Sequence, residues 1–192
     1  MAATYDKYYQ TEHLFGAPYP ELIEFLAAYP NRGKLLDLGC GQGRDALALA
    51  RLGYTVTGLD SSRVGIEQML HQARQEALPV EGLVGDLYAY DQYAGYEVIL
   101  LDSMFHFAKK DREREMGLVR KIVQNMPSAA LLVVCIQDTG SKVAYLTQAL
   151  EEGKPLHRLA DSQFQYTFVD QDSGHQSVTP YRMIAVTNQA PA

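Results

Sequence analysis

Three glycines at alternating positions, Gly39, Gly41 and Gly43, follow a short apolar run that predicts a β-strand. Glycine adopts positive φ easily and leaves no Cβ between the main chain and a ligand, so a nucleotide-type cofactor can lie against such a turn. Asp37 precedes the first glycine, and Cys40 lies between the first two. These residues predict a cofactor-binding site. The alternative is a tight strand-to-helix turn that holds no ligand.

A carboxylate ends the next apolar run, because Asp60 follows residues 54–59, with Ser61 beside it. Ionised aspartate offers only acceptors, which suits the two adjacent hydroxyls of a ribose. Counted from Gly39, the glycines stand at positions one, three and five. Arg44 occupies the sixth, where a dinucleotide site needs a small residue. The spacing therefore favours a nucleoside over a dinucleotide, and an NAD-dependent oxidoreductase is kept as the alternative.

The predicted strands and helices around these residues follow one another in a regular order. From Lys34 onward, short apolar runs alternate with amphipathic helices, a pattern typical of a parallel α/β sheet with crossover helices. Strands are predicted at residues 34–38, 55–59, 81–84, 96–101 and 130–136. Helices are predicted at residues 20–29 and 44–52, after Ser61 or Ser62, through residues 116–126, and from Ser141 to Gly153.

The C-terminal part is predicted to end in a β-hairpin. Residues 164–169 and 181–187 have strand-like composition, and the stretch from Asp170 to Gly174 between them is rich in turn residues. The length of 192 residues predicts a single domain, with residues 1–17 as an N-terminal arm or lid and residues 34–192 as the core.

The composition narrows the classes of partner and cofactor. Seventeen Lys and Arg against 23 Asp and Glu give a net charge of −6, and no basic run is present, so nucleic acid is not expected as a partner. No apolar run approaches the length of a membrane span, and we predict a soluble, cytoplasmic protein. Two cysteines are too few to build a zinc cluster. The acidic stretch from Asp111 to Glu115 fits a helix N-terminus, so no metal site is expected.

With these motifs, the chain resembles the class I S-adenosylmethionine-dependent methyltransferases, and residues 37–62 are similar to the small bacterial tellurite-resistance and thiopurine-type branch. The resemblance rests on Leu35 to Gly43, on Asp60 and on Gly85-Asp86-Leu87. It implies S-adenosylmethionine as cofactor and S-adenosylhomocysteine as product, with Asp86 facing the adenine amine and the Leu87 backbone near the ring. It also implies a Rossmann-like, doubly wound, mostly parallel seven-stranded sheet in the order 3-2-1-4-5-7-6, with the final strand antiparallel.

The segment after the fourth predicted strand is expected to border both cofactor and acceptor. Asp102 could meet the methionyl end of the cofactor or cap the helix that begins near Asp111. Met104 and Phe105 could form an apolar acceptor pocket or plain core. His106 is the first choice for a general base if the acceptor must lose a proton, and its alternative role is packing between two phenylalanines.

Two further residues are interpreted as candidates for substrate binding. Tyr9 belongs to the tyrosine-rich arm, which either covers the cofactor or simply docks on the surface. Arg44 could bind an anionic group or remain solvated. The predicted function is methyl transfer to a small molecule, and a non-catalytic cofactor-binding module is the further alternative. The identity of the acceptor, the atom methylated and the oligomeric state stay open.

Overall fold

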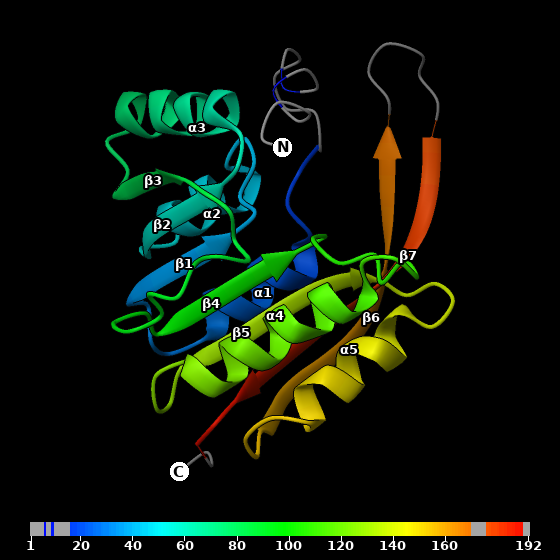
Figure 1. Ribbon diagram of the computed structural model, residues 1–192. Helices are drawn as coiled ribbons and strands as arrows, with labels where there is room; N and C mark the ends of the chain where they lie inside the picture. Colours follow the sequence, from blue (N-terminus) through cyan, green and yellow to red (C-terminus); the bar gives the residue numbers. More distant parts are fainter. Residues whose placement is uncertain (1–5, 7–8, 10–15, 170–175, 190–192) are drawn as a thin grey trace. The chain divides into compact units, whose positions relative to one another are not determined.

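The computed structural model describes residues 6, 9, 16–169 and 176–189 of the chain (Figure 1). Within these residues, seven strands form one sheet in the order β3-β2-β1-β4-β5-β7-β6, which confirms the predicted order. The strands are β1 Lys34–Leu38, β2 Thr55–Asp60, β3 Val80–Val84, β4 Val98–Asp102, β5 Leu131–Gln137, β6 His157–Val169 and β7 Gln176–Thr187. The helices are α1 Pro20–Ala28, α2 Arg44–Arg51, α3 Arg63–Gln75, α4 Arg112–Asn125 and α5 Lys142–Glu151.

Strand directions follow the expected pattern. β1 pairs in parallel with both β2 and β4, and β2 pairs in parallel with β3. β7 is antiparallel to β5 and to β6. The carboxyl ends of β1, β2 and β3 therefore lie at one edge of the sheet, where ligands bind in folds of this kind.

The chain divides into two compact units. The first comprises Met1–Gln92 with Glu97–Leu100, and the second comprises Tyr93–Tyr96 with Leu101–Ala192. In the first unit, every residue of β1 and β2 after the first is buried, because a central parallel strand is covered on both faces. Leu35, Leu36 and Val56 are fully buried there. The single-domain organisation expected from the length remains a prediction.

Helix α3 shows how the sequence fixes a boundary in the first unit. Ser62 is its N-cap, and its Oγ accepts a hydrogen bond from the main-chain N–H of Gly65 at 3.1 Å. Such a cap satisfies one of the main-chain donors left over at the start of a helix. Of the two serines predicted for this role, the structure selects Ser62. This choice leaves Ser61 at the end of β2, half-buried.

In the second unit, α4 and α5 pack side by side (Figure 1). The strands of the hairpin are longer than predicted, because β6 begins at His157 and β7 at Gln176. The added residues are mostly polar and partly exposed, since β6 forms an edge of the sheet and needs no apolar run there. The turn predicted at Asp170 to Gly174 lies outside the described residues.

Candidate cofactor-binding site

The glycine turn after β1 has the backbone conformation that its sequence predicts. Gly39, Gly41 and Gly43 have φ angles of 86°, 53° and 82°, in the left-handed region that other residues rarely adopt. The main-chain N–H groups of Gly39 and Cys40 both donate to the Leu59 carbonyl, at 2.7 and 3.2 Å. The turn is therefore tied to β2 and held in one place.

Close packing provides a second reason for two of these glycines. A Cβ on Gly43 would lie 2.3 Å from Cγ of Met69, and a Cβ on Gly41 would lie 2.7 Å from the Tyr9 hydroxyl oxygen. Neither contact could be anticipated from spacing along the chain. The one-three-five pattern thus serves the packing of α3 and the N-terminal arm as well as any ligand.

Asp60 is bound to the glycine turn itself. Its Oδ2 accepts from the main-chain N–H of Gly41 at 2.9 Å, and its Oδ1 accepts from the N–H of Ser62 at 2.7 Å. Burial raises the pKa of Asp60, and the bonds from Ser62 and Gly41 partly offset that rise. A carboxylate accepts about four hydrogen bonds. Acceptor capacity therefore remains for ribose hydroxyls while the turn stays fixed.

Asp37 is a buried carboxylate with an unused acceptor. Its side chain lies in β1, and among the described residues nothing forms a hydrogen bond with Oδ2. Burial raises the pKa of Asp37 well above its ordinary value. Asp45 and Asp60 add to the rise, and Arg44 acts against it. A buried acceptor left unpaired costs about 1–3 kcal/mol. A ligand group that donates hydrogen bonds or carries positive charge would remove that cost.

Two of the described residues of the N-terminal arm, Tyr9 and Asp6, lie at or near the glycine turn. Tyr9 is buried against Gly41, and its carbonyl accepts from Nε2 of Gln68 at 2.9 Å. Asp6 accepts from the hydroxyl of Ser62 at 2.5 Å. Of the other arm residues, 16 and 17 are described and exposed, and the rest lie outside the described residues. The arm thus touches the turn through Tyr9 and the N-cap of α3 through Asp6.

The side chain of Arg44 contacts two neighbouring side chains of the protein. Its guanidinium forms an ion pair with Asp45 at 2.8 Å and lies 4.7 Å from the centre of the Tyr19 ring. Burial works against the charge, but the contact with Asp45 raises the pKa of Arg44. Its role in substrate binding stays a prediction.

Asp86 and Leu87 follow β3, and the pairing of β2 with β3 brings them near Asp60. Asp60 is the register partner of Val84, and the N–H of Gly85 donates to the Asp60 carbonyl at 2.9 Å. Asp86 is exposed, and its Oδ1 accepts from the N–H of Tyr88 at 2.9 Å. The two carboxylates therefore end neighbouring parallel strands at the same edge.

In the second unit, the segment after β4 begins with a strained residue. Ser103 has a φ of 57°, a conformation that costs a non-glycine residue about 1–3 kcal/mol and is often found at functional sites. Its Oγ donates to Oδ1 of the buried Asp102 at 3.0 Å, and its N–H donates to the Cys135 carbonyl at 2.9 Å. These bonds hold the end of β4 in a defined conformation.

The aromatic residues of this segment are mainly packing residues. Phe105 and Phe107 are buried, and their rings stack with centroids 5.4 Å apart. Met104 is half-buried, and the His106 side chain is exposed. The proposed roles of Met104, Phe105 and His106 toward an acceptor stay predictions.

Glu115 was missed as a site-forming residue. Its side chain is buried, and Oε2 accepts from the N–H of Phe107 at 2.5 Å and from that of His106 at 3.3 Å. The interpretation of Asp111 to Glu115 as acids that serve the helix dipole is therefore incomplete. The available signal was helical spacing, because Glu115 stands four residues before Val119, on the apolar face of α4.

The described residues lack two kinds of feature. They contain no group of three or more His, Cys, Asp or Glu side chains that could hold a metal ion. None of their helices is both long and apolar enough to cross a membrane.

The strand order, the antiparallel β7 and the glycine turn after β1 define a class I S-adenosylmethionine-dependent methyltransferase fold. Magnesium protoporphyrin IX methyltransferase from Synechocystis PCC 6803, solved with bound SAM, aligns with a TM-score of 0.70 and 15% identity, over 88% of this chain and 77% of that one. TehB from Haemophilus influenzae aligns with a TM-score of 0.73 and 18% identity, over 96% of this chain and 66% of that one. This chain belongs to the family of the tellurite resistance protein TehB, whose model matches residues 1–140.

Curated relatives resemble the chain over part of their length. A probable S-adenosyl-L-methionine-dependent methyltransferase TehB of Haemophilus influenzae is 34% identical over 93 residues, which is 48% of this chain and 30% of that protein. The 2-heptyl-1-hydroxyquinolin-4(1H)-one methyltransferase of Mycobacteroides abscessus is 30% identical over 124 residues, 64% and 54% respectively. Hemagglutinin 1 of Eikenella corrodens is 33% identical over 106 residues, which is 55% of this chain and 35% of that protein. The matches thus span about a third to a half of these relatives.

Proposed function

We propose that this chain is an enzyme that transfers the methyl group of S-adenosylmethionine to a small molecule. The observation that carries the proposal is the buried Asp37, whose Oδ2 has no hydrogen-bond partner among the described residues, beside a turn whose conformation is fixed by Asp60. A cationic ligand rich in hydroxyl and amino donors complements two such carboxylates. Membership of the TehB family supports the same conclusion.

The residues of the first unit are assigned to the cofactor. Asp60 and Ser61 would bind the ribose, and Asp86 and Leu87 would receive the adenine. Asp37 would face the cationic methionyl end. The main chain of Gly39, Cys40, Gly41 and Gly43 would lie against the nucleoside, and Asp102 of the second unit is assigned to the methionyl end. The cofactor would supply an activated methyl group on a sulfonium, and S-adenosylhomocysteine would leave as product.

The protein's contribution to methyl transfer is mainly positional. The sulfonium is already a good leaving group, so the chain must align the acceptor with the methyl group and exclude water. Tyr9, Arg44, Met104 and Phe105 are the residues proposed to contact the acceptor. His106, exposed after β4, is proposed as the base for an acceptor that must lose a proton.

A small-molecule acceptor is proposed on the basis of charge and relatives. The chain carries a net charge of −6, which opposes binding to nucleic acid. One relative is named for methylation of a heptyl-hydroxyquinolinone, a small aromatic molecule. The family name points instead to tellurite, an oxyanion. A location in the cytoplasm belongs to the same proposal.

Thermal unfolding tests the choice of cofactor. A ligand that binds only the folded chain, at a hundredfold excess over its Kd, adds about 2.7 kcal/mol to the free energy of unfolding. We expect this with S-adenosylmethionine and S-adenosylhomocysteine, and no stabilisation with NAD. Stabilisation by NAD alone would overturn the proposal.

Methyl transfer is then measured directly with labelled S-adenosylmethionine and a panel of acceptors. The panel comprises aromatic hydroxyl and amine compounds together with tellurite and selenite. The proposal expects turnover with at least one compound. Cofactor binding without turnover on any of them would favour the non-catalytic module.

A further inference from the structure

The β6–β7 hairpin continues past the end of its neighbour β5. The last residue of β5, Gln137, is the register partner of Tyr181, whereas β7 begins further back, at Gln176. Within the described part of the chain, residues 165–169 and 176–180 therefore pair as strands only with each other. A two-stranded ribbon is marginally stable by itself in water. A third strand would stabilise this part of the hairpin, which we call the extension.

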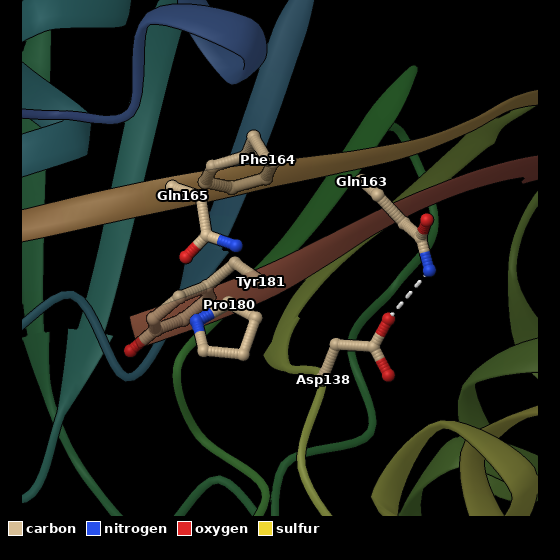
Figure 2. Close-up of a pocket in the computed structure, with 6 residues that line it drawn as sticks. All are labelled: Asp138, Gln163, Phe164, Gln165, Pro180 and Tyr181. Carbon is tan, nitrogen blue, oxygen red and sulfur yellow. Dashed lines mark hydrogen bonds between the residues drawn. The ribbon is translucent and has the colours of Figure 1, made fainter. Parts of the chain in front are cut away.

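The base of the extension is held in place by polar contacts. Nε2 of Gln163 donates to Oδ2 of Asp138 at 2.9 Å, and the main-chain N–H of Asp138 donates to the Pro180 carbonyl at 2.8 Å. These three residues line a small cavity together with Gln165, the first residue of β6 beyond the end of β5 (Figure 2). The extension therefore leaves the sheet from a fixed point.

The outer edge of β6 is protected over only part of its length. β6 is the last strand of the sheet that the described residues form. Edge strands are usually protected from pairing with other chains by charged side chains, proline or a bulge. Arg158 and Asp161 are charged, and the register shifts between Arg158 and Ala160. Residues 162–168 contain no charged residue, proline or glycine, so this part of the edge lacks such protection.

Both faces of β6 are uncharged along residues 162–168. On one face, the side chains of Gln165 and Thr167 are exposed, and Val178, the register partner of Thr167, is 62% exposed. On the other face, Tyr166 packs edge-on against Tyr181, with ring centroids 6.1 Å apart. A strand added along this edge would meet aromatic, amide and hydroxyl side chains and no formal charge.

The sequence of this edge is complementary to itself. Two-fold symmetry brings the same patch of two copies together, and a net charge of −6 opposes such contact except where the patch is neutral. In an antiparallel pair centred on Gln165, residues 166–168 lie beside residues 162–164 of the second copy. Phe164 then faces Tyr166 of the second copy, and aromatic cross-strand pairs stabilise a sheet. The extension of each copy gains its third strand.

We propose that this chain forms a two-fold symmetric dimer in which residues 162–168 of β6 pair antiparallel with the same residues of a second copy, centred on Gln165. The pairing joins the two sheets edge to edge. The inference does not depend on the proposed function, because it concerns only the hairpin and its neighbours in the second unit.

Sedimentation equilibrium of the full chain tests the dimer through charge variants at the symmetry axis. In Gln165→Lys, and likewise in Gln165→Glu, two like charges face each other, and we expect the Kd of the dimer to rise about fivefold or more. A mixture of the two variants brings opposite charges together and should associate as a mixed dimer. The matched controls Gln124→Lys and Gln124→Glu, at an exposed position near the end of α4, should keep the wild-type Kd. Each variant's Tm confirms that it is folded.

Three results would overturn the proposal: a wild type that stays monomeric at every concentration, a dimer that both Gln165 variants leave unchanged, or a mixture that associates no better than either variant alone. Hydrogen exchange adds an independent readout. The amides of residues 162–168 that point away from β7 should become more protected as the concentration of wild type rises. Association without this protection would place the contact elsewhere on the chain and overturn the assignment to β6.

Discussion

The main-chain N–H of Gly41 donates to Oδ2 of Asp60 at 2.9 Å, which joins the turn after β1 to the last residue of β2. The carboxylate assigned to the ribose thus also holds the glycine turn in place. Any change at Asp60 should act on both the turn and the cofactor, and the two effects can be measured separately.

Removing the Asp60 carboxylate should loosen the turn even without cofactor. In Asp60→Ala, the N–H groups of Gly41 and Ser62 lose their acceptor, and a buried donor left unpaired costs about 1–3 kcal/mol. Hydrogen exchange followed by NMR should show the Gly41 amide protected in the wild type and exposed in the variant. Asp91→Ala, at an exposed position, is the control. Equal protection of Gly41 in both proteins would show that the bond does not hold the turn.

Asp37 should make the stability of the cofactor-free chain depend on pH. Its pKa in the folded state is raised well above the ordinary value of 3.8, so between these two values the folded state binds more protons than the unfolded state. The contribution of Asp37 to stability is therefore lost as pH rises through this window. Denaturant unfolding at several pH values should show Asp37→Asn gaining stability over the wild type as pH increases. A difference that stays constant with pH would contradict the burial of a titrating group.

Glu115 is predicted to act as a positioning residue for the segment that follows β4. Glu115→Ala removes the acceptor for the Phe107 and His106 N–H groups, and we expect a stability loss of about 1–3 kcal/mol and a lower kcat. Glu115→Gln retains one acceptor oxygen and should recover part of the kcat. The Kd of S-adenosylhomocysteine should not change in either variant. Equal kcat values for Ala and Gln variants, with only stability altered, would reduce Glu115 to a structural role.

Gly43 is predicted to tolerate no side chain. In Gly43→Ala, a φ of 82° costs about 1–2 kcal/mol, and the new Cβ meets Met69. Adding Met69→Ala removes the contacts with Cγ and Sδ, but Cβ of residue 69 stays at 2.8 Å and the backbone strain remains, so the double variant should recover only part of the loss due to overpacking. Chemical denaturation of the four proteins in this cycle measures the coupling. Additive losses would mean that Gly43 and Met69 do not compete for the same space.

The positions of the buried strands and of the glycine turn could be predicted because their information is local, since apolar runs mark the strands and glycines mark the turn. The strand order was implied by the family resemblance, and the structure confirms it. The polar residues 157–163 gave no such signal, because an edge strand is held by main-chain bonds rather than by an apolar face.

Contacts across long separations in sequence were not predictable in the same way. The bond from Gly41 to Asp60 spans 19 residues, and the contact of Tyr9 with Gly41 spans 32. Neither leaves a periodic pattern. The role of Glu115 was missed for a different reason. In the sequence, a buried acid on the apolar face of a helix cannot be told from an ordinary acid of the first helical turn.

Calorimetric titration of S-adenosylhomocysteine into the wild type, Asp60→Ala and Asp37→Asn measures directly whether the turn after β1 binds the cofactor. We predict saturable binding to the wild type and a Kd raised by about tenfold or more in each variant, because each removes a carboxylate assigned to the cofactor. The Asp91→Ala control should bind like the wild type. Absence of binding to the folded wild type, or equal Kd values for all four proteins, would contradict the assignment of this turn as the cofactor site.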